Sequence, residues 1–300
     1  MQPSFQPRNP YFALVMSLFL PGFGQLYNGE PNKAIWIFLT FLLFFIPGSA
    51  LVALHLPSLL VVPALFSGLA LTLCLWLYGM IDAWRGAKQD YVLQSWQKSG
   101  LYALVFLACN MLAFPLLIGY VRAHEVEAFK IPSKSMEPDI LNGDFIFADK
   151  RYNCPGCKEA VRRGDIAIFV YPNDRTRYYI KRIIGLPGDH VTVRGHEVTL
   201  NGKALSVREA QDKSGTQVTE AVDGRSWQAQ WLNDAKDTPQ VDEIVPPGQV
   251  FVMGDNRRES VDSRFFGTVP LQDVVGRARQ VWFSKNRDGV RWGRLGKVLE

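Results

Sequence analysis

The sequence has few of the side chains that bind metals or carry redox chemistry, with four cysteines and four histidines in 300 residues. Cys74 and Cys109 lie inside apolar runs and are expected to be inert packing residues. Cys154 and Cys157 form a Cys-Pro-Gly-Cys motif, but no second cysteine or histidine pair follows at zinc-finger spacing, which argues against a metal site. A redox pair and a local disulfide stay open, and an oxidising compartment favours the disulfide.

Two common hydrolase motifs are also missing. The sequence has no Gly-x-Ser-x-Gly elbow and no His-Glu-x-x-His helix. Beyond residue 121 the histidines are His124, His190 and His196, and the last two flank a predicted hairpin, where exposed turn histidines are expected. A Ser-His-Asp triad is therefore poorly supported, although its members need not be adjacent in sequence. No metal and no cofactor is expected.

The charge pattern lacks a nucleic-acid signature. The chain carries a formal net charge of +5, but its basic residues are scattered and form no run with interleaved aromatics. Nucleic acid is therefore not an expected partner. A basic surface that faces anionic lipid is the favoured interpretation.

Charged residues are absent from three long apolar stretches, at 34–56, 58–81 and 101–120. A helix that crosses the hydrocarbon of a bilayer needs roughly twenty apolar residues, so each stretch is long enough to span it. The chain beyond residue 121 has an ordinary globular composition. We therefore predict a membrane domain over 1–121 with three full spans, followed by a soluble domain over 122–300.

A further apolar run, at 11–20, is too short to span and ends in Pro-Gly-Phe-Gly. Arg8 before this run imitates a secretory signal, but no small-x-small cleavage site follows and more spans come next. We interpret it as a broken or re-entrant segment packed against the next helix. The pattern Pro-Gly-x-Gly-Gln-x-Tyr-x-Gly at 21–29 resembles a small membrane module appended to various bacterial proteins, and that resemblance implies no chemistry.

The loops predict an orientation. Arg85, Lys88 and Lys98 lie between the second and third spans, whereas residues 55–57 contain no lysine or arginine. Positive loops prefer the cytoplasm, so the loop 82–99 is expected inside and the chain from residue 121 onward outside. Disulfides persist outside the cytoplasm, so this orientation is compatible with a disulfide in the soluble domain.

The soluble domain has the pattern of short strands. Residues 144–148, 165–170, 178–186 and 249–253 are β-rich and bounded by glycine, proline or aspartate. Residues 190–200 alternate around Arg194-Gly195, and Asn201-Gly202 is a strong turn signal. Strand after strand without a long helical pattern predicts an all-β sandwich or open barrel. Residues 203–241 are polar and weakly patterned, and we expect a more mobile insertion there.

One serine loop and one lysine strand are the candidates for chemistry. Residues 131–138 form a two-proline loop with hydroxyls at Ser133 and Ser135. Lys181 lies in the apolar strand 178–186, where burial would lower the pKa of its ammonium toward that of a general base. The simpler alternatives are a turn serine and a lysine on the solvent face of the strand.

Four motifs in this domain resemble the boxes of bacterial type I signal peptidases, and they occur in that family's order directly after a membrane anchor. Each motif alone is weak evidence, whereas the ordered set across 135–264 is specific; residues before 121 lie outside the resemblance. The motifs are Ser135-Met136-Glu137-Pro138, Arg163-Gly164-Asp165, Tyr-Ile-Lys-Arg-Ile-Ile-Gly-Leu-Pro-Gly-Asp at 179–189, and Gly254-Asp255-Asn256-Arg257 with Ser260-Val261-Asp262-Ser263-Arg264.

The resemblance implies a membrane-bound serine endopeptidase with a Ser-Lys dyad. Ser135 matches the nucleophile and Lys181 the base that activates it. Ser133 matches a hydroxyl that joins the Ser135 backbone N–H in an oxyanion hole, and Ser260 a serine that hydrogen-bonds the lysine. The remaining matches are supporting residues: the pair Asp262 and Arg264, and the loop-fixing residues Asp255, Asn256 and Arg257.

The same resemblance implies a substrate and a location. The substrates are exported preproteins cleaved after small residues at −1 and −3, which shallow apolar pockets would read. The implied location is multi-pass in the bacterial inner (cytoplasmic) membrane, with the catalytic domain on the periplasmic side. The phospholipid membrane and the secretion translocon are the other implied partners. The expected pocket walls are Ile131, Pro132, Met136 and Tyr179.

Two residues depart from the family pattern: Lys134 stands where many relatives have glycine, and Asp139 where threonine is usual. Either could alter rate or specificity, but neither removes a catalytic atom. One alternative is a self-cleaving serine-lysine protease of the stress-repressor type, which the membrane half and the lack of a DNA-binding module disfavour. Another is an inactive anchored β-domain that binds exported chains, which the presence of Ser135 and Lys181 disfavours.

Overall fold

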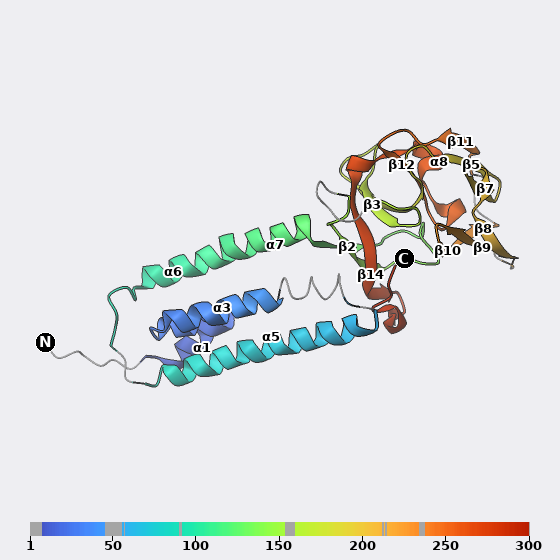
Figure 1. Cartoon of the computed structure of the whole chain (residues 1–300). Helices are drawn as coiled ribbons and strands as arrows, with labels where there is room; N and C mark the ends of the chain where they lie inside the picture. Colours follow the sequence, from blue (N-terminus) through green and yellow to red (C-terminus); the bar gives the residue numbers. More distant parts are fainter. Residues whose placement is uncertain are drawn as a thin grey trace. The chain divides into compact units, whose positions relative to one another are not determined.

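Figure 1 shows the computed structural model, which describes residues 8–45, 56, 58–89, 92–153, 160–211, 213, 215–233 and 238–299. The chain divides into two compact units, Met1–Ala123 and His124–Glu300. The first is helical and the second is built from β-strands, which confirms the predicted fold class. Cys154 and Cys157 lie outside the described residues, so their disulfide stays a prediction.

The helical unit contains two helices that are long and apolar enough to cross a membrane, Pro63–Gly86 and Ser99–His124. They correspond to the predicted spans at 58–81 and 101–120. The other predicted span, at 34–56, is helical as far as residue 45, and residues 46–55 lie outside the described part of the chain. The elements are α1 (Pro10–Phe19), α2 (Phe23–Tyr27), α3 (Pro31–Phe45), α5 (Ser58–Gly86), α6 (Ser99–Leu107), the π-helix η1 (Ala108–Ala113) and α7 (Phe114–His124).

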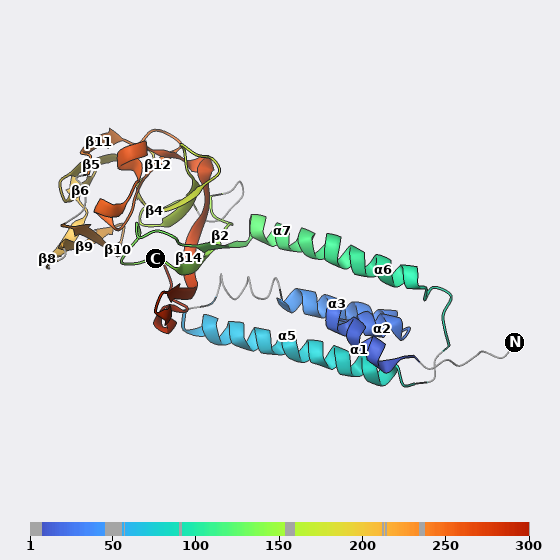
Figure 2. The same ribbon diagram turned by 180° about the vertical axis from the view of Figure 1, so that it is seen from behind.

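The short apolar run forms α1, which begins at a cap where the Asn9 side chain accepts from the backbone of Tyr11 and Phe12. After α1 the chain turns through Gly22, whose φ is 86°. Helix α1 packs against α2, which follows it in the chain, and against α5 (Figures 1 and 2). Ala13 of α1 and Ala83 of α5 are both fully buried, and these small side chains let the two helices approach closely.

The polar residues of the Pro-Gly-x-Gly-Gln-x-Tyr-x-Gly pattern explain this packing. Gln25 is fully buried, and its Nε2 atom donates to the Gly79 carbonyl at 2.7 Å and to Asp82 Oδ2 at 3.0 Å. Asn28 Nδ2 donates to the Ala83 carbonyl at 2.7 Å. In an apolar environment such side chains are costly unless they are hydrogen-bonded, so these bonds tie α2 to α5.

The β unit is organised around a curled sheet in which all neighbouring strands are antiparallel, with the order β1-β2-β14-β3-β4-β12-β13 and β15 beside β14. The long strand β14 lies between β2 and β3, so the end of the chain completes the centre of the sheet (Figure 1). The strands are β1 (Val126–Lys130), β2 (Asp144–Asp149), β3 (Ile166–Val170), β4 (Tyr178–Gly185), β12 (Gln249–Met253), β13 (Val269–Pro270), β14 (Val274–Asn286) and β15 (Gly289–Val290).

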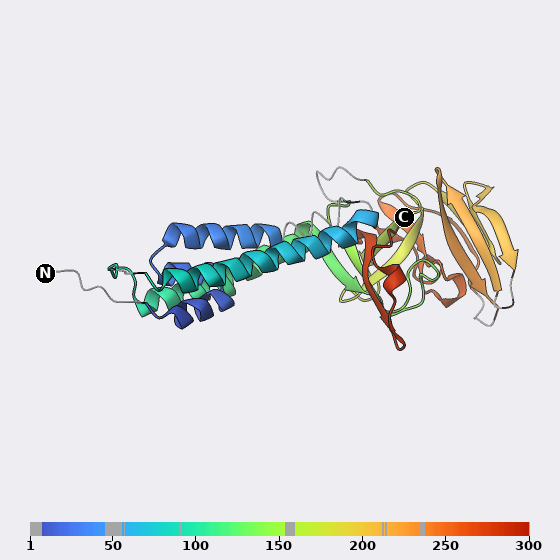
Figure 3. The same cartoon turned by 90° about the horizontal axis from the view of Figure 1, so that it is seen from below.

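Residues 203–241, expected as a weakly patterned insertion, hold regular strands in their described part. The strands β8 (Ser206–Gln211), β9 (Gly215–Val222) and β10 (Arg225–Leu232) form a three-stranded sheet, drawn in yellow to orange in Figure 3. Trp227, Ala229 and Trp231 alternate with exposed or half-buried residues along β10, which is the two-residue period of a strand with one buried face. A second small sheet contains β5 (His190–Arg194), β6 (Glu197–Leu200), β7 (Lys203–Ala204) and β11 (Val241–Ile244).

Gly24 provides a test of the α1–α2–α5 packing. A methyl group at this position would lie 2.3 Å from the Ala13 carbonyl oxygen, 2.4 Å from Ser17 Oγ and 2.6 Å from Ala83 Cβ. We expect Gly24→Ala to destabilise the helical unit by about 1–3 kcal/mol, since overpacking forces the helices apart. The measurement is thermal unfolding of the detergent-solubilised protein, followed by its helical circular dichroism.

The matched control is Gly68→Ala on α5, where an added methyl group meets no heavy atom of the described residues within 4 Å outside its own helix backbone. This variant should unfold at the wild-type temperature or above it, because alanine favours a helix over glycine. Equal unfolding temperatures for the two variants would contradict the packing described here.

Candidate active site

Ser135 lies in the loop 131–143 that joins β1 to β2. Two backbone hydrogen bonds of 2.8 Å close the base of this loop, from Ile131 to the Asp144 carbonyl and from Gly143 to the Ile131 carbonyl. Met136 is fully buried in the apolar core, directly after the serine. Because its neighbours are anchored in this way, Ser135 is held in a defined position with 6% of its surface exposed.

Lys181 lies in β4, between β3 and β12, and is 4% exposed. Its Nζ atom donates to Ser135 Oγ at 2.8 Å and to the Ile180 carbonyl at 3.0 Å. Burial lowers the pKa of Lys181 from 10.5 to about 8, against the opposing influence of the Asp262 and Asp255 carboxylates. The fold thus brings together a serine and a lysine that are 46 residues apart in the sequence.

The two other predicted hydroxyls differ in their surroundings. Ser133 is exposed, and its Oγ atom lies 3.2 Å from Ser135 Oγ. Ser260 is buried, and its Oγ atom has no hydrogen-bond partner among the described residues. The predicted hydrogen bond between Lys181 and Ser260 is therefore not formed in this structure, where Nζ donates to Ser135 and to the Ile180 carbonyl.

The segment 254–264 packs directly onto the serine loop. The Asn256 backbone N–H donates to the Ser135 carbonyl at 3.1 Å, and its side chain donates to the Lys134 carbonyl at 3.3 Å. A methyl group at Gly254 would lie 2.4 Å from the Ser135 carbonyl oxygen and 2.3 Å from Ser260 Oγ. Glycine is required at this position because the two segments approach so closely.

Two buried aspartate–arginine pairs lie next to the lysine. Asp262 accepts from Arg264 at 2.7 and 2.8 Å, so the residues predicted as a supporting pair are in contact. Asp255 accepts from Arg182 at 2.8 Å through each of its two oxygens. All four side chains are nearly or fully buried, where each charge is tolerated only because its partner is present.

Sequence reasoning missed two residues of this network. Arg182 follows Lys181 in the strand motif, and its hydrophobic neighbours were the available signal that it is buried. Glu220 of β9 forms an ion pair with Arg257 and accepts a hydrogen bond from Trp227 Nε1 at 2.9 Å. A single glutamate in a polar stretch gave no sign of this contact.

The four expected pocket residues separate into two pairs. Ile131 is 3% exposed and Met136 is fully buried, and both belong to one apolar cluster. Pro132 is exposed, whereas Tyr179 is half-buried and stacks on Tyr171 with ring centroids 4.2 Å apart. The first pair therefore forms core, and the second pair is accessible.

No group of three metal-binding side chains occurs in the described part of the chain. His190 hydrogen-bonds Asp242 at 2.6 Å, and His196 lies against Trp231, so neither contacts Ser135. The arrangement that can perform chemistry is a hydroxyl in contact with a buried amine whose pKa is lowered.

Comparisons with known proteins identify the family of this chain. Residues 102–283 match the family described as Signal peptidase, peptidase S26. A signal peptidase I from Buchnera aphidicola subsp. Acyrthosiphon pisum is 32% identical over 265 residues, covering 67% of this chain and 83% of that protein. One from Pseudomonas aeruginosa is 33% identical over 199 residues, covering 57% of this chain and 70% of that protein.

Among solved structures, a signal peptidase I from Enterococcus faecalis is 29% identical, covers 40% of this chain and 97% of that chain, and has a TM-score of 0.27. The family match extends over more than half of the sequence and includes Ser135, Lys181 and the segment 254–264. The chain therefore belongs to the signal peptidase family, serine peptidases of family S26 that remove signal peptides from preproteins.

Proposed function

We propose that this protein cleaves preproteins with Ser135 as the nucleophile and Lys181 as its general base. The observation that carries the proposal is the 2.8 Å contact between Lys181 Nζ and Ser135 Oγ. A lysine is normally protonated at neutral pH and cannot accept a proton. Burial removes the hydration that stabilises the ammonium, which leaves a larger fraction of the side chain neutral.

In the reaction, neutral Lys181 accepts the proton of the Ser135 hydroxyl while Oγ attacks the scissile carbonyl carbon. The ammonium so formed then gives this proton to the departing amine as the peptide bond breaks, which leaves an acyl group on Ser135. A water molecule releases the acyl group when Lys181 again acts as base. The hydrogen bond from Nζ to the Ile180 carbonyl holds the amine in direction through these steps.

Ser133 is proposed to donate a hydrogen bond to the oxyanion that forms on the carbonyl. Its hydroxyl is exposed and 3.2 Å from Ser135 Oγ, so both hydroxyls can reach one carbonyl group. Ser260 is proposed as a hydrogen-bond acceptor for Lys181 after the proton transfer. Its buried, unpartnered Oγ can accept from the ammonium once the proton has moved from Ser135 to the lysine.

The supporting pairs are proposed to control the charge around the lysine. The Asp255 and Asp262 carboxylates favour a protonated Lys181, and Arg264, the partner of Asp262, opposes this effect. Substrate side chains at −1 and −3 are proposed to meet the accessible Pro132 and Tyr179, with the buried Ile131 and Met136 as a floor. A shallow floor of this kind accepts only small residues, which a peptide series varied at −1 and −3 would test.

The two units are proposed to serve as a membrane domain over 1–121 and a catalytic domain over 122–300, with residues 203–241 as an insertion in the latter. The two long apolar helices support the anchor. We place the catalytic domain on the periplasmic side of the inner membrane, because Arg85, Lys88 and Lys98 gather in the loop 82–99. Membrane phospholipid and the secretion translocon are the proposed partners besides preproteins.

The dyad predicts a graded series of activities. Ser135→Ala and Lys181→Ala should each abolish cleavage of a preprotein by the purified, folded enzyme. Ser133→Ala should lower kcat by about 10²–10³ with little change in KM, because one oxyanion donor is lost and its bond strengthens mainly in the transition state. Steady-state kinetics on one peptide substrate compares the three variants. Substantial cleavage by either dyad variant would contradict the mechanism, and wild-type kinetics of Ser133→Ala would remove that hydroxyl from the oxyanion hole.

The lowered pKa of Lys181 predicts the pH dependence. The protonated ammonium is inactive as a base, so kcat/KM should be low in acid and rise as the pH increases through about 8. Lys181→Arg should stay protonated throughout and show no activity at any pH. The measurement is kcat/KM of peptide cleavage across this interval. A rate that is constant, or that falls as the pH rises, would exclude Lys181 as the base.

The proposed topology predicts which sites a protease reaches from outside. Trypsin-type protease added to intact spheroplasts should cleave after exposed residues of the β unit such as Arg208 and spare Lys88 in the loop 82–99. After lysis both should be cut. Mass spectrometry of the fragments distinguishes the two sites, and cleavage at Lys88 in intact spheroplasts with protection of Arg208 would reverse the orientation.

A further inference from the structure

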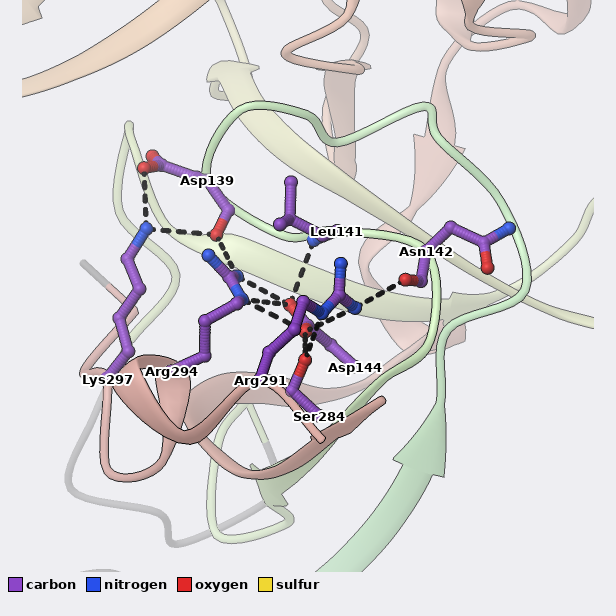
Figure 4. Close-up of polar contacts among 8 residues, drawn as sticks. All are labelled: Asp139, Leu141, Asn142, Asp144, Ser284, Arg291, Arg294 and Lys297. Atoms are coloured by element: carbon purple, nitrogen blue, oxygen red, sulfur yellow. Dashed lines mark hydrogen bonds and ion pairs between the residues drawn. The ribbon is translucent and has the colours of Figure 1, made fainter. Parts of the chain in front are cut away.

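Asp139, four residues after Ser135, makes several ionic contacts. Its carboxylate accepts from Arg182 Nη2 at 3.0 Å and from Lys297 Nζ at 3.3 Å. Its backbone carbonyl accepts from Arg294 at 2.8 Å and from Lys297 at 3.0 Å (Figure 4). Asp139 is thus held from two directions, by β4 and by the C-terminal segment 291–297.

The contact with Arg182 reaches the strand of the proposed base. Arg182 follows Lys181 in β4, and its guanidinium is fully buried and shared between Asp139 and Asp255. Successive strand residues project to opposite faces, so Ser135 and Asp139 of one loop contact adjacent residues of β4 on its two faces. Because the serine loop contacts both faces of β4, its position relative to this strand is fixed.

The other end of the same loop is fixed by the C-terminal segment. Asp144 is fully buried at the start of β2 and accepts from Ser284 at 2.6 Å and from the guanidinium groups of Arg291 and Arg294 (Figure 4). Arg294 therefore contacts both the Asp144 carboxylate and the Asp139 carbonyl. The described charges alternate in sign from Lys297 through Asp139 and Arg182 to Asp255, so no charge in this series lacks an opposite neighbour.

We propose that Asp139 is a positioning residue, which sets the separation of Ser135 Oγ and Lys181 Nζ by tying the serine loop to Arg182, with Lys297 neutralising its second oxygen. This inference rests on the proposed roles of Ser135 and Lys181. Asp139 acts through these residues and takes no part in proton transfer. The role requires a carboxylate, because its two oxygens accept from two different cations, Arg182 and Lys297.

The test compares Asp139→Asn, Asp139→Glu and Lys297→Met by kcat and KM on a peptide substrate, with kcat expressed per active site. Asp139→Asn keeps the size of the side chain and removes its charge, so kcat should fall by about 10- to 100-fold at nearly constant KM, since a misplaced nucleophile slows chemistry and not binding. Asp139→Glu should recover part of the loss because it restores the carboxylate. Lys297→Met, at a half-exposed position, should lower kcat less because Arg182 still holds Asp139.

Two matched controls separate positioning from a general loss of ion pairs. Asp242→Asn removes an aspartate that also bridges two side chains, those of His190 and Arg194. Lys150→Met removes a lysine whose ion pair with Glu127 has the same 3.3 Å length as that of Lys297 with Asp139. Both controls should keep the wild-type kcat.

Wild-type kcat in Asp139→Asn would overturn the inference, as would an equal loss in Asp242→Asn or a raised KM at unchanged kcat. If Asp139→Asn does not fold, Asp139→Glu and Lys297→Met decide the matter through the same two parameters. Failure of the proposed function is seen separately, as cleavage by Ser135→Ala. An inactive Ser135→Ala beside a fully active Asp139→Asn would retain the dyad and refute the role of Asp139.

Discussion

The burial of Lys181 against Ser135 is the constraint around which the β unit is built. An ammonium inside a protein loses its hydration, and this loss lowers its pKa. Carboxylates close by would return the proton to the lysine, yet Asp255 and Asp262 are both near it. Each of them is paired with a buried arginine, and the guanidinium of Arg264 itself lowers the pKa of Lys181. The two aspartate–arginine pairs are therefore consistent with a site that keeps its lysine weakly basic.

Buried ion pairs add little net stability to a protein. Both partners lose their hydration, and their mutual attraction offsets this loss only when the geometry is good. Their value here lies in the segments that they connect. Arg182 joins the lysine strand to Asp255, and Arg257 joins the segment 254–264 to Glu220 of β9. Asp139 and Asp144 connect the serine loop to the end of the chain. A site assembled from distant segments needs directional contacts of this kind, since apolar packing alone fixes position less sharply.

The helical unit is held together by close packing and by hydrogen bonds between its helices. In an apolar environment the hydrophobic effect does not drive helices together. Close packing of small residues and hydrogen bonds between helices stabilise their association instead. Gly24 and Ala13 allow close approach of α1, α2 and α5, and Gln25 and Asn28 bind the backbone of α5. The motif at 21–29 therefore serves to pack α2 against α1 and α5. This gives a physical account of a pattern whose resemblance to a membrane module implied no chemistry.

The sequence by itself determined the division into apolar helices and β-strands, because span length and the two-residue period are local properties of the chain. It also singled out Ser135 and Lys181 as the candidate pair, through the ordered motifs that resemble the signal peptidase family, and the structure places the two side chains in contact. Only the tertiary structure decided which charges meet. The ion pairs of Arg182, Glu220 and Lys297 join segments that are far apart in the sequence. Nothing local to these residues predicts their partners, because the contacts form only when the chain folds. The strands of 203–241 were overlooked for a related reason: their buried face depends on Trp227 and Trp231 packing against strands from elsewhere in the chain, and burial of that kind is a property of the assembled fold.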